Sequence, residues 1–281
     1  MSVRIAPYEA PMAAQVAELF RRQYGVAPAE FLDRFTRFYE HPYQRGRCQR
    51  VVALDGDNVV GFTGFAVWPY ALDGRPFHSF QCCDVLLDPR WRGRGVFPRM
   101  MDVAIDADFV VGFPVEAAKN AFLRNGWANV LDLQWYVKLL NPWRRSTLAC
   151  APSPRPRSLL RLTDDAGFVA WRRNYSHRNR YFVDGPFELK PIRRLRLLRE
   201  LIVGDVRSDD ADFAALVKRT RGATYLSIAM SPLDPLVDRV VRAGFRKVDR
   251  KISFIVKPFS CEDLVTDASR WRLFRADLDT W

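Results

Sequence analysis

The sequence predicts an α/β (α+β) protein, with a mixed, mostly antiparallel central sheet flanked by helices and a second, smaller α/β domain after it. Three observations lead to this prediction. Residues 4–39 carry apolar side chains at helical spacing, and residues 50–87 are rich in β-branched and aromatic residues separated by turn residues. Residues 81–140 then alternate strand and helix patterns around a glycine-containing turn.

The N-terminal third is predicted to contain one short strand, two helices and three strands. Residues 4–24 combine a strand with an amphipathic helix, and residues 28–39 repeat the helical pattern. The apolar face of the first helix is formed by Ala13, Val16, Ala17, Leu19 and Phe20. Between residues 50 and 87, turn residues at 55–58 and 73–74 divide the chain into an antiparallel meander of three strands.

After Pro89, the pattern predicts a turn, a helix, a strand, a second helix and a last strand. The first of these helices directs Met100, Met101, Val103, Ala104 and Ile105 toward a core. A strand at residues 109–113 and a helix at residues 116–124 follow, and Gly126 suits the left-handed position past a helix end. A strand at residues 130–140 closes this unit.

A proline-rich stretch divides the chain. It includes Pro142, Pro152, Pro154 and Pro156 among arginine and serine, a composition that opposes helix and sheet. We therefore expect a first domain at residues 1–141, a linker at residues 142–160 and a C-terminal domain at residues 161–281. The C-terminal domain is predicted to contain helices at residues 213–219 and 236–243 and strands at residues 223–229 and 251–257.

The C-terminal elements repeat the order that ends the first domain. In both, a strand leads to a helix closed by glycine and an aromatic residue, Gly126-Trp127 and Gly244-Phe245, and then to a strand that ends in lysine. A degenerate duplication explains this order. The alternative is that the order is common in any α/β protein.

Composition narrows the functional classes. The formal charge of +12 is compatible with an anionic partner, but only seven of the 44 basic residues are lysine and no nucleic-acid-binding motif accompanies them. Biased arginine usage is therefore preferred, and a nucleic-acid partner is not expected. The five cysteines show no metal-ligand or disulfide spacing, so no metal is expected. No apolar segment has the length of a signal peptide or membrane span, which favours a cytoplasmic protein without membrane association.

The strongest motif lies where the strand at residues 81–87 runs into Asp88-Pro89-Arg90-Trp91-Arg92-Gly93-Arg94-Gly95-Val96-Phe97-Pro98. The first amides of a helix have no partner within the helix and attract phosphates. Gly93 and Gly95 allow positive φ and a close approach of the backbone to a diphosphate. Positive charge near this turn comes from Arg90, Arg92 and Arg94.

Two nucleotide-binding motifs are excluded, since a dinucleotide fingerprint requires a glycine at Pro98 and a P-loop requires Gly-Lys-Ser/Thr. The remaining pattern, Gln/Arg-x-x-Gly-x-Gly/Ala between a strand and a helix, resembles the GNAT superfamily of acetyltransferases. Members of that superfamily use this turn for the pyrophosphate of coenzyme A. The resemblance extends through residues 109–127 and implies a GNAT fold, with acetyl-CoA as acyl donor.

The resemblance also implies roles for individual residues. The backbone of Val85 and Leu87 should line the pantetheine arm, and residues 92–96 should hold the pyrophosphate. Asn120 matches the residue on the helix that flanks the cofactor. A tyrosine four residues before the helix-ending glycine often protonates the leaving thiolate, but this chain has Phe122 there, so its general acid is unassigned.

Two carboxylates are candidates for the general base that acetyl transfer to an amine requires. Asp84 interrupts the apolar strand just before the turn, where desolvation would raise its pKa. Glu116 opens the following helix. Each has a structural alternative: Asp84 as a strand carboxylate satisfied by backbone or arginine donors, and Glu116 as a favourable residue of a first helical turn. Trp171, Tyr175 and Tyr181 either shape an acceptor pocket or belong to a half-buried element.

The expected function is acetyl-CoA-dependent N-acetylation of a primary amine on a small molecule, such as an amino sugar or other metabolite. The alternative, favoured by Phe122, is a non-catalytic GNAT-like module that binds acyl-CoA or a partner. Aminoacyl transfer from a charged tRNA would not need the pyrophosphate turn. The acceptor and the oligomeric state have no motif in the sequence.

Overall fold

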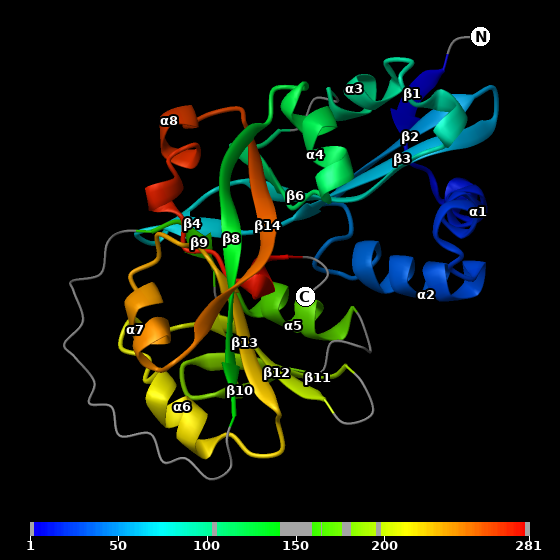
Figure 1. The fold of residues 1–281 in the computed structure, drawn as a ribbon. Helices are drawn as coiled ribbons and strands as arrows, with labels where there is room; N and C mark the ends of the chain where they lie inside the picture. The colour runs from blue at the N-terminus through cyan, green and yellow to red at the C-terminus, as the bar shows by residue number, and fades with distance from the viewer. Residues whose placement is uncertain are drawn as a thin grey trace.

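The structure is a computed structural model that describes residues 3–102, 106–140, 159–163, 165–175, 181–194 and 198–278. Within these residues, one sheet of eleven strands runs through the molecule (Figure 1). Its strands, in spatial order, are β1 (Arg4–Pro7), β2 (Gln49–Asp55), β3 (Asn58–Val67), β6 (Ser79–Leu87), β7 (Phe109–Gly112), β14 (Arg246–Pro258), β8 (Ala128–Leu139), β13 (Tyr225–Met230), β12 (Arg199–Val206), β11 (Phe187–Arg193) and β10 (Phe182–Asp184).

Two N-terminal helices cover one face of this sheet. They are α1 (Ala13–Tyr24), which follows the short helix η1 (Ala10–Met12), and α2 (Pro28–Tyr39). Phe31, Phe35 and Tyr39 recur every fourth residue on α2, so they share one helix face. The rings of Phe35 and Tyr39 pack against Phe62 of β3, and Phe31 packs against Phe35. Both helices and the predicted face of α1 are confirmed.

Two shorter helices lie on the opposite face. They are α3 (Val96–Met101) and α4 (Glu116–Leu123), and both contribute to an apolar cluster with β7 and β14. The described part of α3 ends at Met101, and the predicted continuation through Val103, Ala104 and Ile105 lies outside the described residues. Gly126 adopts φ +77°, as predicted for a position just past a helix end.

The predicted antiparallel meander is confirmed as β2, β3 and β6. Between β3 and β6, the chain forms two short strands, β4 (Tyr70–Leu72) and β5 (Arg75–Pro76), which the sequence did not indicate separately. Strand β4 pairs with β5 on one side and with β9 (Arg161–Leu162) on the other, in a separate sheet, so a segment after the proline-rich stretch adds to the N-terminal half.

The C-terminal half contributes to the same large sheet. Strand β14 lies between β7 and β8 and is antiparallel to both, while β13 pairs with the other edge of β8 (Figure 1). The division into domains at residues 142–160 stays a prediction, because residues 141–158 lie outside the described residues. The remaining helices are α5 (Ala166–Asn174), α6 (Phe213–Arg219), α7 (Val237–Arg242), α8 (Glu262–Val265), η3 (Ala268–Arg270) and η4 (Arg275–Asp277).

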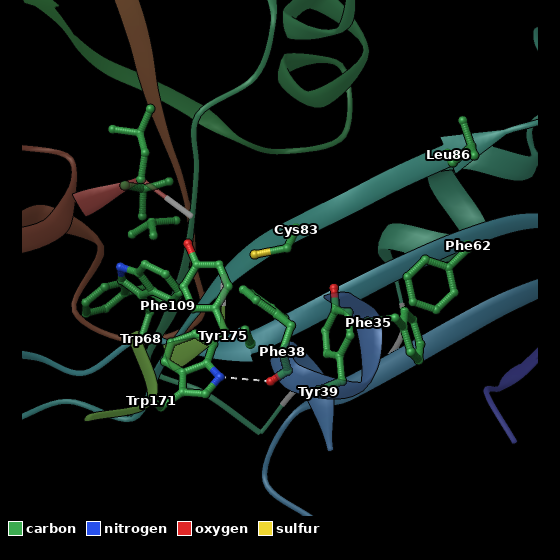
Figure 2. Close-up of a cluster of buried hydrophobic side chains, with 14 of the residues drawn as sticks. Phe35, Phe38, Tyr39, Phe62, Trp68, Cys83, Leu86, Phe109, Trp171 and Tyr175 are labelled. Carbon is green, nitrogen blue, oxygen red and sulfur yellow. Dashed lines mark hydrogen bonds between the residues drawn. The ribbon is translucent and has the colours of Figure 1, made fainter. Parts of the chain in front are cut away.

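Helix α5 packs into the main core, and its aromatic side chains are buried there. Trp171 is fully buried and Tyr175 nearly so, and the indole N–H of Trp171 donates to the backbone oxygen of Phe38 at 2.9 Å (Figure 2). These two rings therefore pack within the core and are too deeply buried to form an open acceptor pocket. In the described part of the chain, no helix is both long and apolar enough to span a membrane.

Candidate functional site

The site begins where two parallel strands of the sheet separate. The ladder between β6 and β7 pairs Ser79 with Phe109, Phe80 with Val110 and Gln81 with Val111, and no further pairs follow among the described residues. Strand β6 continues to Leu87, whereas β7 ends at Gly112. The β7-facing edge of residues 82–87, which includes Val85 and Leu87, is therefore open to an extended ligand.

The turn after β6 is held by its own side chains. Asp88 caps the short helix η2 (Pro89–Trp91) by accepting from the Arg90 backbone N–H at 2.9 Å. The same carboxylate binds the Arg90 guanidinium at 2.9 and 3.1 Å, and Arg92 donates to the Leu87 carbonyl oxygen at 3.3 Å. Arg94 lies over the Trp91 ring, 5.3 Å from its centroid. Arg90, Arg92 and Arg94 therefore stabilise the turn through these contacts and also give it positive charge.

Both glycines of the turn adopt left-handed backbone conformations. Gly93 has φ +73° and Gly95 has φ +71°, and a β-carbon added at either position would meet no atom within 4 Å. Backbone conformation therefore explains these glycines, and the open space beside them leaves the peptide accessible. The next residue, Val96, is buried and anchors the turn to the core at the start of α3.

Helix α4 lies beside α3. The ring of Phe122 is buried between the rings of Phe97 on α3 and Trp127, with distances between ring centroids of 5.1 and 5.0 Å. Position 122, where the resemblance noted in the sequence implies a tyrosine, is therefore a packing position in this chain. Asn120 and Glu116 are exposed on α4, on the face of the sheet that also carries α3.

Asp84 lies in a β-bulge of β6. Phe62 pairs with Leu86 and Gly64 pairs with Cys83, so Asp84 and Val85 together oppose the single residue Thr63. Asp84 has φ +51°, in a region that L-residues other than glycine rarely adopt. A bulge of this kind usually places glycine at the left-handed position and redirects a side chain beside a functional site.

The carboxylate of Asp84 has two partners on α2, across the sheet from α3 and α4. The Tyr39 hydroxyl donates to Oδ2 at 3.1 Å, and Nη2 of Arg34 lies 3.6 Å from Oδ1. Burial raises the pKa of Asp84 above its ordinary value, against the lowering effects of the Arg34 charge and the Tyr39 hydrogen bond. The structure thus places Asp84, Val85 and Leu87 on one strand that leads through η2 into the glycine turn, whereas Glu116 lies on the opposite face.

Sequence reasoning did not find Tyr39 or Arg34 as neighbours of Asp84. Gly64 was the available signal, since a glycine inside a strand often marks a close approach of another group. A β-carbon at Gly64 would lie 2.2 Å from the Tyr39 hydroxyl oxygen, which shows that the glycine makes room for this side chain. Among the described residues, no cluster of three or more His, Cys, Asp or Glu side chains could hold a metal ion.

Comparison with known proteins relates one part of the chain to a protein family and the fold to several solved structures. Residues 13–119 match the model of the acetyltransferase (GNAT) family. Three solved structures, each 12% identical, share the fold: a GCN5-related N-acetyltransferase from Kribbella flavida, one from Anabaena variabilis, and a probable N-acyltransferase from Enterococcus faecalis V583. No curated protein sequence matches the chain.

The structural likeness extends beyond the matched residues. The Kribbella flavida structure has a TM-score of 0.60, and the match covers 91% of this chain and 71% of that one. For the Anabaena variabilis structure the TM-score is 0.62, with 95% and 75% covered. For the Enterococcus faecalis structure it is 0.63, with 91% and 72% covered. The chain therefore has a GNAT fold that includes its C-terminal half. The match to the GNAT acetyltransferase family model itself is limited to residues 13–119.

Proposed function

We propose that the protein is an acyl-CoA-dependent N-acetyltransferase that transfers the acetyl group of acetyl-CoA to a primary amine of a small molecule, such as an amino sugar or other metabolite. The observation that carries this proposal is the open edge of β6, with the bulged Asp84 at one end and the Gly93–Gly95 turn at the other. The match of residues 13–119 to the GNAT acetyltransferase family model supports the acyl-transfer chemistry.

The open edge suits coenzyme A. Backbone groups of Val85 and Leu87 bind the amide-containing pantetheine arm as a neighbouring strand would, and the backbone of residues 92–96 binds the pyrophosphate. Asn120 flanks the cofactor from α4. Acetyl-CoA supplies an activated acetyl thioester when bound.

Asp84 acts as the base. It accepts the proton that the amine loses, and its raised pKa strengthens it for this task. A carboxylate must be ionised to act as a base, so activity is present above the pKa of Asp84 and lost as the pH falls through it. Glu116, on the other face, is the second candidate base.

The test combines binding and turnover. Calorimetry should detect coenzyme A binding, and thiol release from acetyl-CoA should appear with at least one member of an amine panel. Asp84→Asn should lower kcat by about 10²-fold or more, because it removes the base, while coenzyme A affinity stays unchanged. Asparagine also tolerates the left-handed conformation, so this variant keeps the bulge. An Asp84→Asn protein with wild-type turnover would remove Asp84 from the mechanism.

The packing of Phe122 favours a second candidate function, a non-catalytic GNAT-like module that binds acyl-CoA or a partner protein. No hydroxyl is present at position 122 to protonate a leaving thiolate. Coenzyme A binding without thiol release for any amine would favour this function over acetyl transfer.

A further inference from the structure

The hydroxyl of Tyr39 is held in one position. Tyr39 is fully buried, and its ring packs against three phenylalanine rings. The distances between ring centroids are 4.8 Å to Phe35, 4.7 Å to Phe38 and 6.2 Å to Phe62. Figure 2 shows the hydroxyl directed from α2 toward strand β6. Burial, together with the nearby Asp84 carboxylate, raises the pKa of Tyr39 well above its ordinary value. The hydroxyl therefore stays protonated and remains a donor.

Strand β3 provides the space for this hydroxyl. A β-carbon at Gly64 would lie 2.2 Å from the Tyr39 oxygen and 2.6 Å from Cζ, both far inside contact distance. Gly64 pairs with Cys83, the residue before Asp84, in the middle of the sheet. Glycine is unfavourable within a strand, so its presence here indicates that the close approach matters.

The two oxygens of Asp84 are held differently. Oδ2 accepts from the buried Tyr39 hydroxyl, whereas Oδ1 faces Arg34 at 3.6 Å, beyond hydrogen-bonding distance. The Arg34 side chain is 49% exposed, so a cationic amine can displace it at little energetic cost. Other titratable groups near the pair are the thiols of Cys83 on β6 and Cys48 before β2. The Arg50 guanidinium, paired with Glu40, also lies over the Tyr39 ring, 5.7 Å from its centroid.

We propose that Tyr39, admitted by Gly64, is a positioning residue for Asp84: its hydroxyl holds Oδ2 and leaves Oδ1 to receive the proton of the acceptor amine. This inference rests on the proposed function, in which Asp84 is the base. The reaction itself is unchanged, since Tyr39 keeps its proton throughout and the amine proton passes to Asp84.

Tyr39→Phe tests the inference, because it keeps the ring and removes only the hydroxyl. Loss of a hydrogen bond to the ionised carboxylate should raise the pKa of Asp84 by about one unit. The titration is read from carboxyl-carbon NMR of the full chain, with Asp84→Asn identifying the signal. The acidic limb of the kcat/KM profile should move up equally. Above that limb, kcat should fall about tenfold because Oδ1 is no longer held toward the amine, while KM for acetyl-CoA stays constant.

Tyr70→Phe is the matched control. Tyr70 is also fully buried, and its hydroxyl donates to a buried carboxylate, that of Asp277, at 3.3 Å. This variant should lose stability to a similar extent and leave the titration of Asp84 unchanged. A titration of Asp84 that is the same in Tyr39→Phe as in the wild type would overturn the inference.

Gly64→Ala tests the same device without removing the hydroxyl. The new methyl group should displace Tyr39 and raise the pKa of Asp84 as Tyr39→Phe does. In the Tyr39→Phe background it should have no further effect on that titration, and additive shifts would contradict the proposal. If the titration shifts are found but no amine is acetylated, the positioning of Asp84 stands and the proposed acetyl transfer is the part that fails.

Discussion

Asp84 adopts a backbone conformation that suits glycine better than aspartate. A left-handed conformation destabilises an L-residue by roughly 1–2 kcal/mol, so the surrounding sheet must hold Asp84 in place. The bulge opposite Thr63 and the Tyr39 hydrogen bond supply that restraint. Strained residues of this kind cluster at functional sites, and the strain is consistent with the proposal that Asp84 is the general base.

The left-handed conformation of Gly95 leads to a second prediction at the residue scale. Gly95→Ala should destabilise the protein by about 1–2 kcal/mol because alanine is strained at positive φ, and it should weaken coenzyme A binding because the turn reorganises. Calorimetry and chemical denaturation measure the two effects.

Gly25→Ala is the control for this prediction, since Gly25 has φ +68° and equally open surroundings at the end of α1. It should show a similar loss of stability and unchanged coenzyme A affinity. Equal weakening of binding by both alanines would mean that the turn has no special part in the site.

At the residue scale, the sequence indicated Asp84 and the two glycines through their chemical types and their order along the chain. It did not indicate the positive φ of Asp84, because the same residues without the register shift would form a regular strand. Tyr39 and Arg34 are 45 and 50 residues away from Asp84 along the chain, and no local sequence pattern joins them to it.

At the scale of elements, a polar cluster links the two halves of the sheet. Ser253 of β14 donates to Asp132 of β8 at 2.7 Å and accepts from Lys119 of α4 at 2.9 Å. Lys251 adds an ion pair to Asp132 at 3.1 Å. Burial opposes the ionisation of Asp132, but these hydrogen bonds and charges outweigh it and lower its pKa.

Ser253→Ala should therefore destabilise the protein by about 1 kcal/mol, because the half-buried Lys119 and Asp132 each lose a hydrogen bond. Urea denaturation at neutral pH measures the change in the free energy of unfolding. As a control, Ser269→Ala removes an exposed bond to Asp267 on η3 and should change stability by less than about 0.5 kcal/mol. Equal effects of the two substitutions would show that the cluster does not join the strands energetically.

Periodicity predicted the elements whose apolar residues face one core. It predicted α1, α2 and α6 because most of their polar residues point outward. The meander was predicted from its β-branched and aromatic residues and from the turn residues between its strands. It missed α5, β11 and β12, where charged residues are buried. Arg172 of α5 pairs with Glu188 of β11 at 2.6 Å inside the protein, which breaks the polar and apolar alternation that identifies a strand.

The whole molecule depends on β14. This strand fills the space between β7 and β8, so residues 1–140 alone would expose two apolar strand edges in the middle of their sheet. We expect that fragment to be insoluble or aggregated, and to lack coenzyme A binding, when assayed by size-exclusion chromatography and calorimetry.

Adding β14 back provides the control. Arg246 pairs with Val137 near the end of β8, so a short glycine-rich turn can join residue 140 directly to residue 246. This shortened chain, continued to residue 278, should be more soluble than the fragment without β14. A soluble, monomeric fragment of residues 1–140 that binds coenzyme A would contradict the structural dependence on β14.

The sequence by itself determined the fold class, the order of most elements and the position of the glycine turn, because these depend on local periodicity, glycine chemistry and a motif of contiguous residues. The tertiary structure alone decided that β14 completes the N-terminal part of the sheet, that Phe122 and Trp171 are core residues, and that Tyr39 meets Asp84 through the gap at Gly64. These contacts join residues far apart in the chain, and only the packed sheet brings them together.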